Sequence, residues 1–161
     1  MISERPTSCS AGPGNYSPQI SNSGSSWEPD RRLTTNPASS ASPSVSVSGS
    51  SVHVVWQDNR DGNAEIYYKR SLDGGATWGS DVRLSAAANN SVNPSLASVG
   101  QSLYLVWSDE RGGRGETYFK RSTDGGVSWL SELNLSADTV RSAYPTVAAS
   151  GQTVHVAWED Y

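Results

Sequence analysis

Short segments rich in β-branched and aromatic residues alternate along the chain with turns rich in Gly, Ser, Asn and Asp. In the segment Val52–Trp56, positions 52, 54 and 56 share one face of a strand, and positions 53 and 55 share the other. Both faces are largely apolar, as expected for a sheet packed between two neighbouring sheets. The pattern therefore predicts an all-β protein of short strands joined by turns.

This pattern repeats with a period of 51 residues. Five independent positions keep the spacing in three copies without an insertion: Trp27, Trp78 and Trp129; Trp56, Trp107 and Trp158; Leu33, Leu84 and Leu135; Pro43, Pro94 and Pro145; Tyr16, Tyr67 and Tyr118. An internal repeat of this kind decides the fold class before any other feature does.

Each complete repeat predicts four short antiparallel strands. In the first they cover Ser44–Ser48, Val52–Trp56, Glu65–Arg70 and about Ser80–Leu84. In the second they cover Ser95–Val99, Leu103–Trp107, Glu116–Arg121 and Ser131–Leu135. We expect each first strand to begin after its proline, because proline has no N–H for the strand ladder. Four strands per repeat of about 40–50 residues are typical of a β-propeller blade, so the chain holds three blade equivalents.

The repeat also predicts how the chain is divided. We expect residues 1–14 to form a flexible arm and residues 15–161 to form the blades. The division is a half-blade at 15–34, blades at 43–85 and 94–136, and a half-blade at 145–161. The first half-blade supplies a third and a fourth strand (about Asn15–Ile20 and Glu28–Leu33), and the last supplies a first and a second (about Thr146–Ala149 and Val154–Trp158).

A turn of fixed sequence, Ser-x-Asp-Gly-Gly-x-Thr/Ser-Trp, lies between the third and fourth predicted strands of each complete repeat. Its members are Ser71, Asp73, Gly74, Gly75, Thr77 and Trp78, and Ser122, Asp124, Gly125, Gly126, Ser128 and Trp129. The Asp can accept hydrogen bonds from nearby backbone N–H groups, the glycines permit positive φ, and the Trp anchors the turn by apolar contact. We therefore expect a structural role for these carboxylates, rather than a catalytic or metal-binding one.

The turn resembles the Asp-box, or BNR repeat, of sialidase-like β-propellers, and a degenerate third copy at Ile20–Trp27 extends the resemblance over about residues 16–161. The resemblance implies a six-bladed propeller whose Asp-boxes lie opposite the active site. It is also the one suggestion of an extracellular or periplasmic location, since no signal peptide is visible at the N-terminus.

The resemblance implies further catalytic groups in a true sialidase: three arginines for the substrate carboxylate, a tyrosine nucleophile with a glutamate partner, and an aspartate acid/base. The Phe/Tyr-Arg-Ile-Pro segment that supplies the first arginine is missing here, so no catalytic residue is assigned. Tyr67 and Tyr118, beside Glu65 and Glu116, could be read as nucleophile pairs. Because they share the register of Tyr16, packing is the favoured interpretation.

The candidate ligand-binding residues are Asp58, Arg60, Asp109 and Arg111, in turns that follow the second strand of each repeat. Arginine presents a planar fork to a carboxylate, so a ring of such turns around a central funnel could hold an anionic sugar. The alternative, favoured by the repetition, is that each Asp–Arg pair braces its own turn or the neighbouring blade.

Composition and charge exclude several classes of partner. The net charge is −4 with a pI near 5.1, and no basic run is present, so we expect neither nucleic-acid nor membrane binding. A single cysteine, Cys9, excludes an internal disulfide and a thiolate metal cluster. We expect no metal and no cofactor.

The complementary half-blades predict a partner, namely a second copy of the chain. In a head-to-tail homodimer each C-terminal half-blade completes the N-terminal half-blade of the other copy, which gives six blades. The alternative is that the chain is a piece of a longer protein or a designed sequence. For function, two hypotheses remain: a non-catalytic propeller scaffold that binds glycan or protein ligands, or a sialidase-type glycoside hydrolase or a fragment of one.

Overall fold

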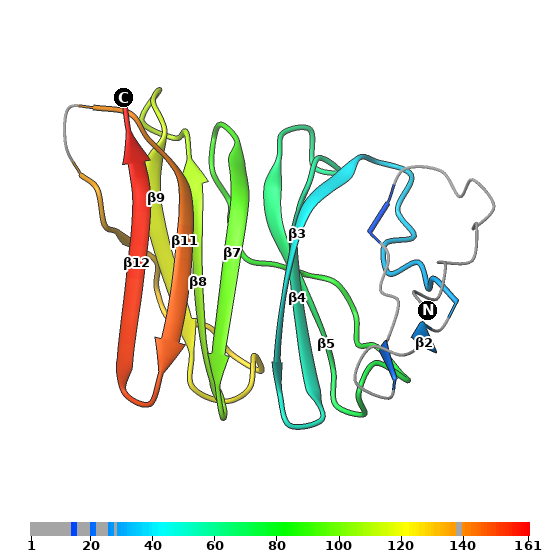
Figure 1. The fold of residues 1–161 in the computed structure, drawn as a ribbon. Coiled ribbons are helices and arrows are strands. Elements are labelled where there is room, and N and C mark those ends of the chain that lie inside the picture. Colours follow the sequence, from blue (N-terminus) through cyan, green and yellow to red (C-terminus); the bar gives the residue numbers. More distant parts are fainter. Residues whose placement is uncertain (1–13, 16–19, 22–25, 28, 138–139) are drawn as a thin grey trace.

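The structure is a computed structural model that describes residues 14–15, 20–21, 26–27, 29–137 and 140–161. Every regular element among these residues is a β-strand (Figure 1). Residues 1–13 of the expected arm, and most of the expected strand at Asn15–Ile20, lie outside the described residues. Within the described part of the chain, no helix has the length and apolarity that a membrane crossing requires.

The strands form four antiparallel sheets. Blade A contains β3 (Ser40–Ser48), β4 (Ser51–Asp58), β5 (Glu65–Ser71) and β6 (Val82–Arg83). Blade B contains β7 (Ser91–Val99), β8 (Ser102–Asp109), β9 (Glu116–Ser122) and β10 (Leu133–Asn134). Half-blade C contains β11 (Ser142–Ser150) and β12 (Thr153–Asp160), and a short hairpin joins β1 (Ile20–Ser21) to β2 (Ser26–Trp27). The predicted all-β class and the four-stranded antiparallel sheets are confirmed.

The sheets stand side by side, with blade B between blade A and half-blade C (Figure 1). The first strands of neighbouring sheets contact one another along this stack, and we call β3, β7 and β11 the inner strands. The turns after β4 and β8 lie at one edge of the stack, called here the turn edge. The Ser-to-Trp turns, residues 71–78 and 122–129, lie at the opposite edge and are called the box turns.

The inner strands differ from the prediction because they begin four residues earlier. In β3 the register shifts between Ala41 and Ser44, which marks a β-bulge, and Ser42 has a positive φ of 50°. The same shift occurs in β7 and β11, where Asn93 and Tyr144 have φ values of 54° and 51°. The proline that follows each of these residues therefore sits inside a bulge, where a ladder N–H is not required, and does not begin the strand.

The fourth strands are shorter than predicted, with two residues each. The chain still runs beside the third strand, since the N–H of Leu84 donates to the carbonyl of Ile66 and that of Leu135 to Thr117. At the N-terminus the N–H of Leu33 donates in the same way to the carbonyl of Asn15 at 2.8 Å. Asn15 and Leu33 thus pair as the third and fourth strands of blades A and B do, while β2 precedes the predicted span 28–33.

The core lies between the blades. Its larger cluster joins blades A and B and consists of Val55, Ile66, Tyr68, Leu84, Leu96, Leu103, Leu105 and Trp107. A second cluster packs Leu33 against Val54, Trp56 and Tyr67 of blade A. Residues from both faces of β4 enter these two clusters, so the prediction that this strand is buried on both faces is confirmed.

Candidate functional site

The candidate residues Asp58 and Arg60 meet at the turn edge of blade A. Arg60 binds both carboxylate oxygens of Asp58, with Nε 2.8 Å from Oδ1 and Nη2 2.7 Å from Oδ2. Its third nitrogen, Nη1, donates to Asp81 at 2.8 Å. The guanidinium carbon also lies 4.3 Å from the centre of the Tyr67 ring. All three guanidinium nitrogens of Arg60 are therefore bound within the protein.

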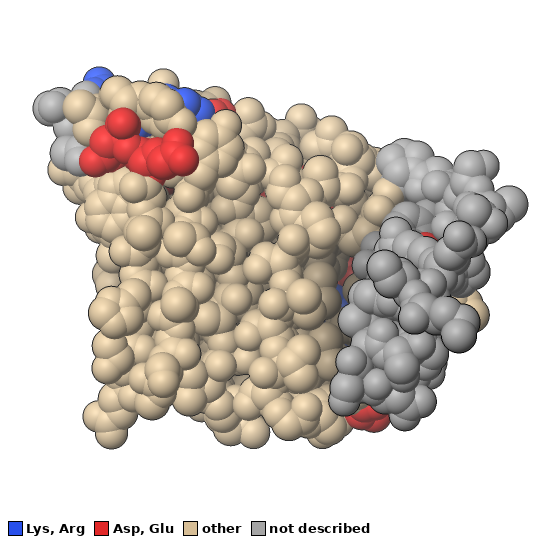
Figure 2. All heavy atoms as spheres, in the orientation of Figure 1, with Lys and Arg blue, Asp and Glu red and all other residues tan. Residues whose placement is uncertain are grey.

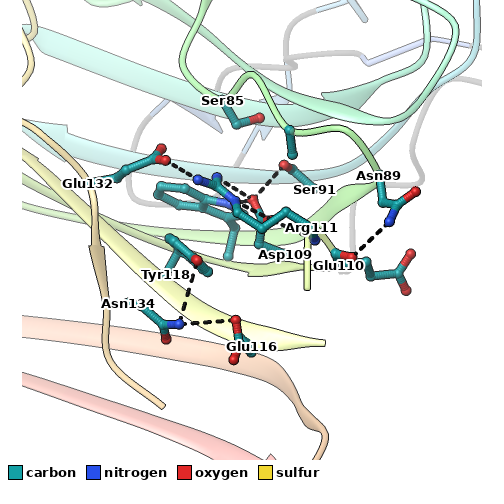
Figure 3. Close-up of polar contacts among 12 residues, drawn as sticks. Ser85, Asn89, Ser91, Asp109, Glu110, Arg111, Glu116, Tyr118, Glu132 and Asn134 are labelled. Atoms are coloured by element: carbon teal, nitrogen blue, oxygen red, sulfur yellow. Dashed lines mark hydrogen bonds and ion pairs between the residues drawn. The ribbon is translucent and has the colours of Figure 1, made fainter. Parts of the chain in front are cut away.

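Asp109 and Arg111 repeat this arrangement in blade B (Figure 3). Nε of Arg111 donates to Oδ1 of Asp109 at 2.7 Å, Nη2 donates to Oδ2 at 2.8 Å, and Nη1 pairs with Glu132. The guanidinium carbon lies 4.2 Å from the centre of the Tyr118 ring. The structure brings each candidate Asp together with the Arg of its own turn, and it does not bring the two pairs together into one cluster.

The carboxylate of Asp58 is fully buried yet charged. Burial opposes its ionisation, but hydrogen bonds from Arg60, Trp56 and Ser40 outweigh burial and lower the pKa of Asp58 to about 2. The pKa of the buried Asp109 is lowered in the same way, against the effect of burial. A buried ion pair offsets the cost of desolvating its charges only when both partners are also well hydrogen-bonded, as Asp58 and Arg60 are. The geometry favours the bracing role that the repetition suggested.

A buried carboxylate that the sequence analysis considered only as a partner of Tyr67 connects the two blades. Glu65 is fully buried and accepts hydrogen bonds from Arg83 at 2.7 Å and from Ser85 at 2.5 Å. The hydroxyl of Ser91, at the start of blade B, lies 3.4 Å from Glu65 and 3.0 Å from Asp109. The signal for this role was present in the sequence, since serine recurs at positions 40, 91 and 142.

The Asp residues of the box turns bind their own turns. Asp73 accepts from the N–H of Thr77 at 2.8 Å and from its hydroxyl at 2.5 Å, and it contacts the hydroxyl of Ser71. These bonds from Thr77 and Ser71 lower the pKa of Asp73 to about 2. Asp124 makes the same contacts with Ser128 and Ser122. Both carboxylates are used within the turn, and the structural role expected for them stays a prediction.

The tyrosines that could be read as nucleophiles are packed. The ring of Tyr67 stacks on Trp56 at 6.0 Å, and its hydroxyl donates to Asp61. Burial, with a contribution from Asp61, raises the pKa of Tyr67 to about 12, and burial also raises the pKa of Tyr118. A nucleophilic phenol needs a lowered pKa or an adjacent base that takes its proton. Tyr67 does have an adjacent carboxylate in Asp61, so the packing interpretation rests on the raised pKa values and on the ring contacts with Trp56 and Trp107.

Sequence reasoning missed the bulge residues Ser42, Asn93 and Tyr144, which lie near the turn-edge end of the inner strands. Their backbone is the same in every repeat, whereas their side chains differ. Positive φ is uncommon for residues other than glycine, and bulges often aim a side chain at a functional site. The signal was a variable residue before each periodic proline. Tyr144 is the most prominent of the three, with 54% of its surface exposed.

The turn edge of blade A also carries a small cavity of about 90 Å³, lined by Ser39, Ala41, Gln57, Asp58, Asn59 and Ala64. Pockets that enclose small ligands are larger, roughly 300–1,000 Å³. Within the described residues, no group of three or more His, Cys, Asp or Glu side chains is arranged to hold a metal ion.

No model of a known protein family and no curated protein matches the sequence. Solved structures do match. A point mutant of the NanB sialidase from Streptococcus pneumoniae aligns with 93% of this chain at a TM-score of 0.62 and 14% sequence identity. The chain has a sialidase-like fold. NanB in complex with 2-[(3-chlorobenzyl)ammonio]ethanesulfonate aligns with 91% of the chain at a TM-score of 0.59 and 15% identity. The matched regions span about a quarter of those proteins, 25% and 24%.

Proposed function

We propose that this sialidase-like chain is a non-catalytic propeller module that binds glycan or protein ligands. The observation that carries the proposal is the state of the two turn arginines. Arg60 and Arg111 each donate to two carboxylates and lie over a tyrosine ring. An arginine that recognised a substrate carboxylate would have to give up these contacts, which would leave a buried aspartate without its charge partner.

The bulge residues supply the ligand-binding surface in this proposal. The positive φ is the same at Ser42, Asn93 and Tyr144, but the side chains differ. The same backbone conformation therefore presents a different side chain in each repeat. A rigid aromatic side chain such as exposed Tyr144 offers a broad apolar face together with a hydroxyl, at a low entropic cost of ordering. Serine and asparagine add hydrogen-bonding groups that suit sugar hydroxyls or a peptide backbone.

The second candidate function is a sialidase-type glycoside hydrolase, and the structural similarity to NanB favours it. Hydrolysis of that type needs free arginines for the carboxylate of the sugar and an activated nucleophile. Arg60, Arg111, Tyr67 and Tyr118 are the arginines and tyrosines that recur in both complete blades near the turn edge, and all four are engaged in internal contacts. The binding function agrees better with this geometry.

The test combines a glycan array with a hydrolysis assay. The wild-type chain should bind a subset of glycans, and Tyr144→Ala should reduce that binding at least tenfold. Leu72→Ala is the matched control, because Leu72 is 62% exposed but lies in a box turn at the opposite edge. Release of the fluorophore from a fluorogenic sialoside would favour the hydrolase instead. Equal glycan binding by the wild type and Tyr144→Ala would place the binding surface elsewhere.

A further inference from the structure

Neighbouring inner strands are joined by hydrogen bonds that recur with the repeat. The N–H of Leu96 in β7 donates to the hydroxyl of Ser44 in β3 at 3.1 Å. One repeat later, the N–H of Val147 in β11 donates to the hydroxyl of Ser95 in β7 at 3.2 Å. A Ser46–Ser98 hydroxyl pair at 2.7 Å has the same separation of 52 residues. Each inner strand thus presents serine hydroxyls to the inner strand that follows it, and bonds to the serine hydroxyls of the inner strand before it.

Blade A has no inner strand on its N-terminal side among the described residues. Its outer half is covered, because Leu33 packs against Val54, Trp56 and Tyr67. The inner half is open: Val45 and Val47 of β3 are 61% and 59% exposed. The corresponding face of β7 is closed, where Leu96 is only 6% exposed because β3 covers it.

Half-blade C presents the opposite face. Val147 points toward blade B and is 9% exposed, whereas Thr146 and Ala148, which alternate with it in β11, are exposed. Thr146 occupies the repeat position of Ser44 and Ser95, so its hydroxyl stands where an inner-strand acceptor is expected. The exposed face of β11 therefore has the chemistry of the faces by which β3 and β7 hold their neighbours.

We propose that these two open faces bind each other between two copies of the chain. The hydroxyl of Thr146 accepts the N–H of Val45 of the second copy, as Ser44 accepts that of Leu96. Ala148 then packs against Val47 of the second copy, at the position where Ser46 meets Ser98. This inference rests on the repeat geometry and does not depend on the proposed function.

The chemistry of both strands suits this contact. Neither β3 nor β11, all of whose residues are described, contains a charged side chain, and small residues predominate in both. On the side of the stack that Figure 2 shows, uncharged atoms cover most of the visible surface and charged side chains gather toward its edges. Two such surfaces can approach closely without burying an unpaired charge.

The number of copies in the proposal follows from the range of blade numbers that propellers use. A head-to-tail contact either closes into a ring or continues as a filament. Two copies supply six blade equivalents, within the range of four to eight that propellers use, whereas one copy supplies three. In the proposed dimer each open face is occupied by one further copy, and both contacts are made by the same pair of surfaces.

A charge-exchange experiment tests this proposal by light scattering on a size-exclusion column. Wild type should elute with a mass near twice 17.1 kDa. Val47→Glu and Ala148→Arg, each prepared alone, should have a mass near 17.1 kDa, because each places an unpaired charge in both contacts. When the two variants are mixed, the dimer should return, since one contact is then wild type and the other pairs Glu with Arg.

Val127→Glu is the matched control, because Val127 is 69% exposed in a box turn and belongs to neither strand, so this change should leave the mass unchanged. Thr146→Val removes one hydroxyl and keeps the volume of the side chain, so it should weaken the dimer. This variant provides the test if a charged variant does not fold. A wild-type mass of 17.1 kDa would overturn the proposal. A dimer mass in both charged variants, or failure of their mixture to dimerise, would also overturn it.

Discussion

The hydroxyl of Tyr68 in blade A lies directly against Gly126 in the box turn of blade B. A Cβ atom at position 126 would stand 2.0 Å from that oxygen. The adjacent carbonyl of Gly125 accepts a hydrogen bond from Arg70 of blade A at 2.7 Å. The box turn of one blade is thus fitted to the third strand of the blade before it, so these turns join blades as well as close hairpins.

This contact predicts that Gly126→Ala is more destabilising than other substitutions of glycines with positive φ. Gly100→Ala is the control, because Gly100 has a φ of 57° but a Cβ atom there would have no neighbour within 4 Å. Both changes carry a backbone cost of about 1–2 kcal/mol, and the overlap with Tyr68 adds about 1–3 kcal/mol at position 126. Urea unfolding measures the difference, and equal losses would show that the blades do not meet there in solution.

The Arg60–Asp58 pair predicts that a single charge cannot replace the guanidinium. Arg60→Lys keeps the charge but loses the two-point contact with Asp58, so the free energy of unfolding should fall by about 1–3 kcal/mol. Arg121→Lys, at an exposed position in β9, should change it by less than about 0.5 kcal/mol. Chemical denaturation of both variants measures this, and a stable Arg60→Lys would contradict the bracing role.

Asp58 predicts a loss of stability in acid. Its pKa is about 2 in the folded chain against an ordinary value of 3.8, so the unfolded chain takes up the proton first as the pH falls. The stabilisation is therefore complete above about pH 5 and decreases between about pH 4 and 2. In Asp58→Asn the dependence of unfolding free energy on pH in this range should be shallower. An unchanged slope would mean that Asp58 ionises normally in the fold.

His53 predicts a second pH effect, nearer neutrality. It is buried, its Nδ1 lies 2.8 Å from the hydroxyl of Tyr68, and burial and Arg70 lower its pKa below 6.5. His53 is therefore protonated more readily in the unfolded chain than in the folded chain. As a result, the free energy of unfolding decreases as the pH falls below about 6.5.

The repeat itself offers a variant that tests this effect. Blade B has Tyr104 and Phe119 where blade A has His53 and Tyr68, and their rings are stacked at 6.5 Å. The double variant His53→Tyr, Tyr68→Phe should reduce the decrease in Tm between pH 7.5 and 5.5. Because each protein is compared with itself, a general loss of stability does not affect the result. The same decrease in the variant would assign the effect to another group.

The sequence predicted what the repeat determines locally. The strand order, the box turns and the apolar positions of β4 and β8 follow from periodicity, because each depends on residues within one blade. The bulges at Ser42, Asn93 and Tyr144 were not predicted, since a proline is compatible with either a strand start or a bulge. The Pro-based start of the inner strands was for this reason four residues late.

The sequence identified the charged turns but not their contacts, and the ligand-binding role suggested for their Asp and Arg residues stays a prediction. The pattern Trp-x-Asp-x-Arg indicated a charged turn, but it did not show that each arginine also binds a second carboxylate. Asp81 and Glu132 come from the segments that lead into the fourth strands, 21 residues further along the chain. Contacts between blades, such as those of Glu65 with Ser91 and of Tyr68 with Gly126, depend on how sheets stack, which one repeat cannot show.

Amide hydrogen exchange at Val45, measured by NMR on the wild-type chain, tests the central claim of a closed pair of copies most directly. If Thr146 of a second copy accepts this N–H, the Val45 amide should be protected to a degree similar to those of Leu96 and Val147, which occupy the same repeat position. In Val47→Glu the protection of Val45 should disappear while that of Leu96 remains. Rapid exchange of Val45 in the wild type, beside protected Leu96 and Val147 amides, would contradict the claim.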